Sequence, residues 1–343
     1  MGFTPGQTVD AMVPLAAASE RFLSSLAERT RLARGYASPN TARTYRRVLG
    51  LLASHLGEER QDVGHLTRED IVAFLAEQRG RGLSAATLNL YLSCLRSFFE
   101  WATREYPYRC TTNVATNIIP AAPEEPQTKL LDWAQIQGFL DYLAKDRKAQ
   151  KRDLVLFELM ARTGARVSEV CRMNLDAVSL REEGVLLRLP GKGETEREVF
   201  VPVLDEQGEE IPEAARFRKR LREYLTGPRR RWEARPGHED ALFLTNFGRR
   251  LWVRTLQSAF HHYRNKLELE GVTLHSLRRA FITHMLAPRE EGGAGADAAT
   301  VSRIVGHASP QVTLSLYGRT DAERLTRAMG RAFSPGSPAS RAN

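Results

Sequence analysis

Residues 163–169 read Thr-Gly-Ala-Arg-Val-Ser-Glu and directly follow an apolar stretch at residues 154–161. Because apolar side chains cover most sides of that stretch, it predicts a helix at the centre of a hydrophobic core. Gly164 ends the helix, and Arg166 then places a guanidinium group beside the core. An arginine after a helix is often only a partner of the helix dipole. Arg166 therefore indicates a functional site only if other polar residues join it.

Further residues of this kind lie toward the C-terminus. His275 and Arg278 are three positions apart, which places them on one face of an expected helix. His307 precedes a segment that ends at Tyr317, and Lys192 stands between two glycines in an expected turn. Each of these residues alone would be interpreted as an ordinary core or surface residue. Their combination is what predicts a chemical site.

These residue types suit the transfer of a phosphoryl group to a protein nucleophile. Arginines hold the non-bridging oxygens of a phosphate and offset the charge that builds up in the transition state. Histidine accepts a proton or donates a hydrogen bond near neutral pH, and a lysine with a lowered pKa protonates a leaving oxygen. A tyrosine phenol is a nucleophile whose phosphodiester keeps the bond energy for religation.

The same sequence gives no indication of a metal site or another cofactor. No acidic cluster stands near these residues, and the cysteines Cys94, Cys110 and Cys171 fall in no metal-ligand spacing. An odd number of widely spaced cysteines also suggests a reducing compartment without structural disulfides. We therefore expect a reaction that uses neither a metal ion nor a cofactor.

In order and spacing, the set resembles the active-site boxes of the tyrosine recombinases, the phage integrase family. Residues 163–169 resemble the first arginine box, and His275-Ser276-Leu277-Arg278-Arg279 is similar to the HxLRH box. Val305-Gly306-His307 and the later Tyr317-Gly318 resemble the last box. Gly191-Lys192-Gly193 is similar to the lysine hairpin of the Xer-like branch.

The resemblance implies a role for each residue. Tyr317 would be the nucleophile that forms a 3′-phosphotyrosyl link, and Arg166 and Arg278 would hold the scissile phosphate. Lys192 would be the general acid for the leaving 5′ oxygen. His275 would accept a proton.

Two further residues have implied roles, and two positions depart from the family pattern. His307 would donate a hydrogen bond to the phosphate, and Glu169 would orient neighbouring groups. Arg279 stands where the second histidine of the HxLRH box is usual. The interval from His307 to Tyr317 is one residue longer than in the commonest form of the family, which a loop would absorb.

Proline density indicates where the chain divides. Between Tyr106 and Gln127 four prolines interrupt the helical pattern, and such a segment favours an extended connection. The first half resembles the family's core-binding domain, most clearly at residues 38–45 and 84–102. We expect the following parts: a flexible N-terminus at 1–17, a helical core-binding, DNA-binding domain at 18–118, a linker at 119–128, a tyrosine recombinase catalytic domain at 129–333 and a disordered tail at 334–343.

Local signals place several elements within these parts. Residues that cap helices at their N-termini stand at Ser38, Thr67, Ser84 and Asp132. Residues 185–189 and 198–201 predict two strands of a β-hairpin. The expected fold is mainly α, and the resemblance implies a two-domain DNA clamp, in which a helical domain and an α+β catalytic domain with a small β-hairpin or sheet grip a duplex.

The formal net charge of +9 favours a polyanionic partner, because each neutralised phosphate releases counterions. The resemblance specifies that partner as double-stranded DNA with recombination sites. It further implies a homo-tetramer on DNA, with or without a second recombinase, and strand exchange through a Holliday junction. Candidates for reading DNA in the first domain, each of which is otherwise a residue of a solvated helix face, are Arg43, Arg47, Thr87, Asn89 and Arg96.

No apolar run reaches the roughly 20 residues that span a bilayer, and no signal-peptide pattern opens the chain. We therefore expect a cytoplasmic, nucleoid-associated protein without membrane contact. Two alternatives stay open beside the recombinase. One is a tyrosine-type DNA topoisomerase, which would relax supercoils without strand exchange between sites. The other is a catalytically inactive DNA-binding accessory protein.

Overall fold

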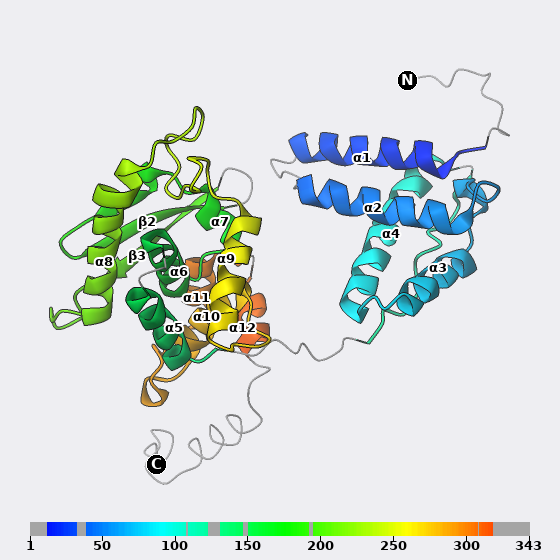
Figure 1. Cartoon of the computed structure of the whole chain (residues 1–343). Coiled ribbons are helices and arrows are strands. Elements are labelled where there is room, and N and C mark those ends of the chain that lie inside the picture. Colours follow the sequence, from blue (N-terminus) through cyan, green and yellow to red (C-terminus); the bar gives the residue numbers. More distant parts are fainter. Residues whose placement is uncertain are drawn as a thin grey trace, which may run out of the picture. The chain divides into compact units, whose positions relative to one another are not determined.

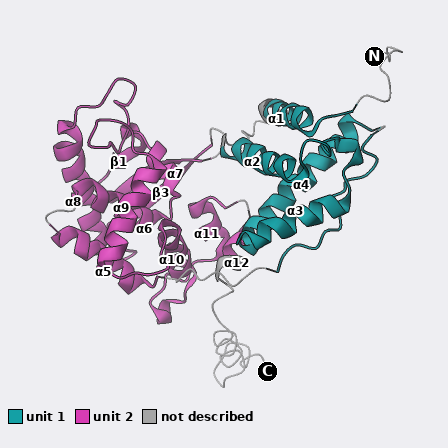
Figure 2. Ribbon diagram, turned by 45° about the vertical axis from the view of Figure 1, so that its right-hand side comes forward, with its two compact units in different colours: residues 1–126 teal, residues 127–343 magenta. Residues whose placement is uncertain are grey.

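The computed structural model describes residues 12–32, 39–107, 109–122, 131–146, 150–191, 195–307 and 309–317. The chain divides into two compact units, Met1–Pro126 and Gln127–Asn343 (Figure 2). The division falls within the stretch 119–128, where the prolines lead us to expect a linker. Of that linker, residues 123–128 lie outside the described residues, as does the tail expected at 334–343.

Unit 1 is helical in its described part (Figure 1). Its elements are α1 (Leu15–Leu32), α2 (Pro39–Leu56), a short 3-10 turn at Val63–His65, α3 (Arg68–Gly80) and α4 (Ala85–Glu105). Thr67 and Asp70 form the expected reciprocal cap of α3, and Ser84 caps α4 by accepting from the backbone N–H of Thr87. The cap signals in the sequence therefore located both helix starts.

The core of unit 1 is built around aromatic rings. Phe22 of α1 lies with its ring centroid 5.2 Å from that of Tyr45, 5.5 Å from that of Phe98 and 5.4 Å from that of Trp101. These rings come from α1, α2 and α4, so the three helices share one core. The pairs with Tyr45 and Phe98 are edge-to-face, and such pairs contribute stability beyond that of the apolar area that they bury.

The beginning of α1 differs from the flexible stretch expected at residues 1–17. Leu15 is fully buried, and its N–H donates to the carbonyl of Gln61 at 2.7 Å. The N–H of Val63 donates to the carbonyl of Val13 at 3.0 Å. The physical reason is helical spacing, since Leu15 and Phe22 are apolar and face the same core. Residues 1–11 lie outside the described residues.

Unit 2 combines a set of helices with a small sheet (Figure 1). Its helices are α5 (Trp133–Lys145), α6 (Lys151–Thr163), α7 (Val167–Arg172), α8 (Pro212–Tyr224), α9 (Val253–Lys266), α10 (Leu274–Leu286), α11 (Ala298–Val305) and α12 (Pro310–Tyr317). Shorter turns lie at Leu175–Ala177, Leu225–Arg229 and Arg289–Glu291. Asp132 caps α5 as expected.

The sheet is antiparallel with the order β1-β2-β3, where β1 is Val178–Leu180, β2 is Gly184–Pro190 and β3 is Glu196–Pro202. The hairpin predicted from the sequence is β2–β3, which is therefore confirmed. The strand β1 was not predicted, because three residues are too short to show alternation.

Helix α6 is the centre of unit 2, as its apolar composition predicts. It packs against α5, α8 and α10, and most of its side chains are buried. Its buried Glu158 is balanced by Arg162 at 3.0 Å and Arg220 at 2.9 Å. Among the described residues, no helix combines the length and the apolar composition needed to cross a membrane.

Gly164 lets the end of α6 approach two other helices. Its backbone is in the left-handed region, with φ of 60°. A β-carbon at this position would lie 2.6 Å from Cδ1 of Phe281 in α10 and 3.0 Å from Cγ1 of Val305 in α11. Only glycine satisfies both the backbone conformation and this close approach.

Gly164→Ala should therefore lower the free energy of unfolding by about 2–4 kcal/mol, because backbone strain and overpacking add. Urea unfolding followed by circular dichroism measures the loss. The matched control is Gly208→Ala, where φ is 85° but nothing lies within 4 Å of the new carbon. Strain alone should cost about 1 kcal/mol there. Equal losses in both variants would contradict the packing argument.

Candidate active site

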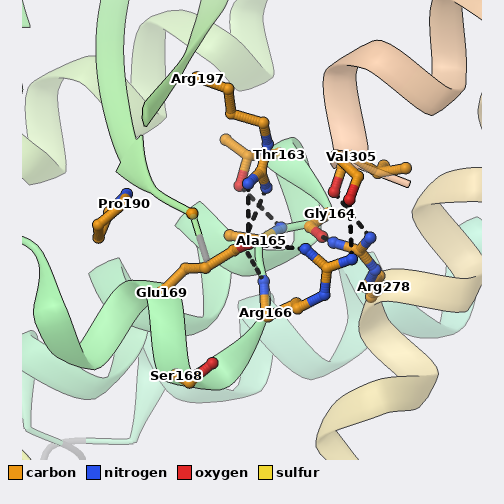
Figure 3. Close-up of polar contacts among 12 residues, drawn as sticks. Thr163, Gly164, Ala165, Arg166, Ser168, Glu169, Pro190, Arg197, Arg278 and Val305 are labelled. Atoms are coloured by element: carbon orange, nitrogen blue, oxygen red, sulfur yellow. Dashed lines mark hydrogen bonds and ion pairs between the residues drawn. The ribbon is translucent and has the colours of Figure 1, made fainter. Parts of the chain in front are cut away.

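Arg166 is held at the start of α7 by a buried carboxylate (Figure 3). Its backbone N–H donates to Oε2 of Glu169 at 2.7 Å, and its Nη1 donates to Oε1 at 2.8 Å. The Glu169 side chain is 2% exposed, whereas that of Arg166 is 42% exposed. The carboxylate thus anchors a guanidinium that still reaches solvent.

Glu169 has a second partner, Arg197 of β3. Nη1 of Arg197 donates to Oε1 at 2.8 Å and its Nη2 donates to Oε2 at 2.9 Å, a two-pronged arrangement. Burial raises the pKa of Glu169, but the hydrogen bonds from Arg197 and Arg166 outweigh it and hold that pKa below its usual value. Glu169 is therefore a carboxylate at neutral pH.

Arg278 of α10 lies deeper, with 1% of the residue exposed. Its Nη1 donates to the carbonyl of Gly164 at 2.5 Å and its Nη2 to the carbonyl of Val305 at 2.7 Å (Figure 3). Burial lowers the pKa of Arg278 to about 9, and the positive charge of Arg166 adds to that effect. The guanidinium nevertheless stays charged at neutral pH.

The C-terminal end of α11 joins these arginines. Arg197 donates through Nε to the carbonyl of Ile304 at 2.8 Å, Arg278 to that of Val305 at 2.7 Å, and Arg166 to that of Gly306 at 2.9 Å. The last carbonyls of a helix have no partner within the helix and carry its negative end. Three cations from different elements thus fix the end of α11 and the start of the following loop.

That loop carries His307, whose Nδ1 lies 2.8 Å from Oγ1 of Thr313 in α12. Burial lowers the pKa of His307 to about 4, helped by the charges of Arg278 and Arg166. His275, the second residue of α10, also has a lowered pKa, from partial burial first and then from Arg278 and Arg279. Both imidazoles are therefore neutral near pH 7.

Two of the expected site residues are described incompletely or not at all. Lys192 lies outside the described residues, and Tyr317 is described only as the last backbone position of α12. The base of the lysine hairpin is described: the N–H of Gly191 donates to the carbonyl of Thr195 at 2.6 Å. Nη2 of Arg172 donates to the carbonyls of Pro190 and Gly191 at 2.8 and 3.0 Å.

Arg197 and Thr313 belong to this arrangement, but the sequence did not single them out. Arg197 did leave a signal, because strand alternation puts it on the same face as Val199 and Val201, which are buried. An arginine on a buried face needs a partner. Thr313 left no comparable signal in its short helix.

The five DNA-reading candidates in unit 1 lie in different surroundings. Arg43 and Arg47 are exposed on α2, four residues apart, and Thr87 pairs with Ser84 in the cap of α4. Asn89 exchanges two hydrogen bonds with the backbone of Ala121 at 2.9 and 2.8 Å. Arg96 donates to the carbonyls of Ala115 at 3.2 Å and Ile118 at 2.5 Å. Asn89 and Arg96 thus tie the segment 115–121 to α4.

The described ranges also contain no group of three His, Cys, Asp or Glu side chains arranged to hold a metal ion. The site consists instead of guanidinium, imidazole, carboxylate and hydroxyl groups. Two guanidiniums beside neutral imidazoles can bind a phosphate diester and move protons at its oxygens.

Comparison with known proteins assigns the family. Residues 129–324 match the model of the phage integrase family, and residues 20–106 match that of the phage integrase N-terminal SAM-like domain. The chain belongs to the phage integrase family of tyrosine recombinases. It is therefore a site-specific recombinase that cuts and rejoins DNA, as the resemblance implied.

Individual relatives agree with this assignment. The recombinase is 31% identical over 310 residues to tyrosine recombinase XerD of Yersinia pestis, covering 89% of this chain and 93% of the relative. It has a TM-score of 0.67 to the XerH recombinase bound to a palindromic difH substrate after cleavage, at 20% identity over 91% of this chain and 84% of XerH. A lambda integrase tetramer bound to a Holliday junction gives a TM-score of 0.66 at 19% identity, covering 90% of this chain and 78% of the lambda integrase chain. The expected fold class, mainly helical with a small sheet in the catalytic domain, is confirmed.

The recombinase should depend on Arg197 for stability. Arg197→Ala leaves the buried Glu169 with one partner, which should lower the free energy of unfolding by about 3 kcal/mol. Arg197→Lys keeps the charge but not the planar guanidinium, and it should lower the free energy of unfolding by less. Denaturant unfolding of the full chain measures both.

The matched control is Arg188→Ala on the neighbouring strand, where the arginine pairs with the exposed Asp176 at 3.3 Å. That change should cost no more than about 0.5 kcal/mol. If Arg197→Ala were as mild as Arg188→Ala, the buried carboxylate would not depend on Arg197.

Proposed function

We propose that Tyr317 attacks the scissile phosphate and forms a 3′-phosphotyrosyl intermediate. The observation that carries this proposal is the convergence of Arg166, Arg278 and His307 on the end of α11, next to the helix that ends at Tyr317. A phosphate bound there would meet two positive charges and a neutral imidazole. The family's nucleophile is a tyrosine, and Tyr317 completes the set.

The two arginines differ in exposure and so in their proposed contributions. Arg166 is partly exposed, and its guanidinium would contact the non-bridging oxygens directly. Arg278 is buried, with both arms on backbone carbonyls, and its charge would act at short range in a site of low polarity. Together they would offset the negative charge that builds up at phosphorus.

The remaining groups would transfer protons or position their neighbours. His275 is neutral near pH 7, as a proton acceptor for the Tyr317 hydroxyl must be. Lys192 would protonate the leaving 5′ oxygen from its hairpin. His307 would donate a hydrogen bond to the phosphate, and Glu169 would keep Arg166 in place.

We further propose that the two domains expected from the sequence, 18–118 and 129–333, grip double-stranded DNA as a clamp, and that four protomers exchange strands through a Holliday junction. The assembly of lambda integrase as a tetramer on such a junction supports this. The recombinase would act on DNA in the cytoplasm, with its own copies or with a second recombinase. The similarity to XerD favours strand exchange between sites over the topoisomerase and inactive-protein alternatives.

A suicide substrate tests the nucleophile. The protein is incubated with nicked duplexes built from DNA that flanks its gene, and adducts are separated on a denaturing gel. The wild type should form a covalent adduct, and Tyr317→Phe should form none, because the phenolic oxygen is the attacking atom. Mixing two cleavable duplexes should give exchanged strands, whereas a topoisomerase would only reseal each one.

Tyr142→Phe is the matched control, since it also removes a phenolic oxygen. Tyr142 lies in α5, and its hydroxyl donates to Asp146, the residue that follows α5, at 3.3 Å. That variant should keep the adduct. An adduct that persisted in Tyr317→Phe would assign the nucleophile to a different residue.

Salt dependence tests the proposed DNA contacts of Arg43 and Arg47. The double change to alanine should weaken duplex binding and reduce the slope of log K against log salt by about 2, one for each lost phosphate contact. Fluorescence anisotropy over a range of salt concentrations measures it. The matched control, Arg216→Ala with Arg222→Ala on exposed positions of α8, removes the same charge. Equal effects of the two pairs would show only a general effect of net charge.

A further inference from the structure

A short chain of hydroxyl groups connects α11 with α12 behind His307. Nδ1 of His307 lies 2.8 Å from Oγ1 of Thr313, and that oxygen lies 2.6 Å from Oγ of Ser302. Thr313 is fully buried and Ser302 is 4% exposed. Since buried hydroxyls of this kind are hydrogen-bonded, the direction of each bond has a definite effect on the imidazole.

The neutral imidazole has one N–H, and its second nitrogen is an acceptor. The pKa of His307 lies at about 4, so the neutral form prevails near pH 7. A proton on Nδ1 would be donated to Thr313, which would leave Nε2 as an acceptor. A proton on Nε2 would require Thr313 to donate to Nδ1.

The hydroxyl protons decide between these two forms, because Ser302 and Thr313 have one each. If Ser302 donates to Thr313, the Thr313 proton is available for Nδ1 of His307, and both hydroxyl protons then lie in short hydrogen bonds. In the opposite direction Thr313 donates to Ser302, whose own proton must go to the carbonyl of Ser309, 3.5 Å away. That distance is at the limit of a hydrogen bond, so this direction of donation gives little stabilisation.

A bound phosphate would give a second reason for the ring proton of His307 to lie on Nε2. Arg166 and Arg278 donate to the carbonyls of Gly306 and Val305, the two residues before His307, so the imidazole lies near the group that those arginines would hold. An acceptor nitrogen facing a phosphate oxygen would be repelled, whereas an N–H would be attracted.

We propose that Thr313 is a positioning residue that accepts from Ser302 and donates to Nδ1 of His307, so that Nε2–H faces the scissile phosphate. This inference rests on the proposed function, in which His307 donates to the phosphate. It extends that function by naming the residue that selects the required tautomer. Thr313 also lies one helical turn before Tyr317 in α12, so the same hydrogen bond joins His307 to the nucleophile's helix.

Nitrogen-15 NMR of the histidine rings reads the tautomer directly, because protonated and bare ring nitrogens have well-separated shifts. The full chain is used, bound to an uncleaved duplex in the Tyr317→Phe form, and His307→Gln identifies the signal. The expected result is a proton on Nε2 in the presence of Thr313 and a mixture of tautomers in Thr313→Val. A proton on Nδ1 in the complex with Thr313 present would overturn the proposal, and this measurement needs no variant of Thr313 to fold.

Cleavage rates give the second readout. Thr313→Val, which keeps the shape but removes the hydroxyl, should slow adduct formation by about tenfold, the size expected for one hydrogen bond. Thr313→Ser keeps the hydroxyl and should restore the rate. Melting temperatures of both variants show whether the fold is intact.

A double-mutant cycle separates positioning from packing. If Thr313 acts through His307, Thr313→Val should have no further effect on cleavage in the His307→Gln background. Independent, multiplicative losses would overturn the proposal. Should His307→Gln alone leave cleavage unchanged, the proposed role of His307 in catalysis would fail, while the tautomer spectrum would still decide what Thr313 does.

Discussion

The catalytic unit depends on one buried carboxylate. Glu169 accepts from Arg166 on one side and from the fork of Arg197 on the other, and it is nearly inaccessible to water. A buried charge with a single partner would be unfavourable, whereas one shared between two guanidiniums is compensated. Because its partners come from α7 and β3, this single group joins the helix start that carries Arg166 to the sheet that carries the lysine hairpin.

At the end of α11, too, groups that each need a partner satisfy one another. Its last carbonyls need donors, and the arginines of the site need acceptors when no phosphate is bound. Arg197, Arg278 and Arg166 supply those donors to Ile304, Val305 and Gly306 in turn. Positive groups that would otherwise repel one another are thus kept in place without DNA, and in the proposed reaction this would be the preorganisation that electrostatic catalysis requires.

The sequence predicted features formed by neighbouring residues, but not contacts between residues that are far apart in the chain. Thr67, Ser84 and Asp132 marked helix starts because a cap involves residues three positions apart. The boxes around Arg166, His275 and His307 were recognisable because each is a short segment. In contrast, Arg197 meets Glu169 across 28 positions, and Arg96 reaches Ala115 across 19. Such pairs depend on how the elements pack, which no local pattern records.

The shared end of α11 has a mechanical consequence. Side chains from β3, from α10 and from the start of α7 all attach to consecutive carbonyls of that one helix end, and α12 packs against α11. A displacement of the end of α11 would therefore change the hydrogen bonds of Arg166, Arg197 and Arg278 together, so the positions of these three side chains depend on one another.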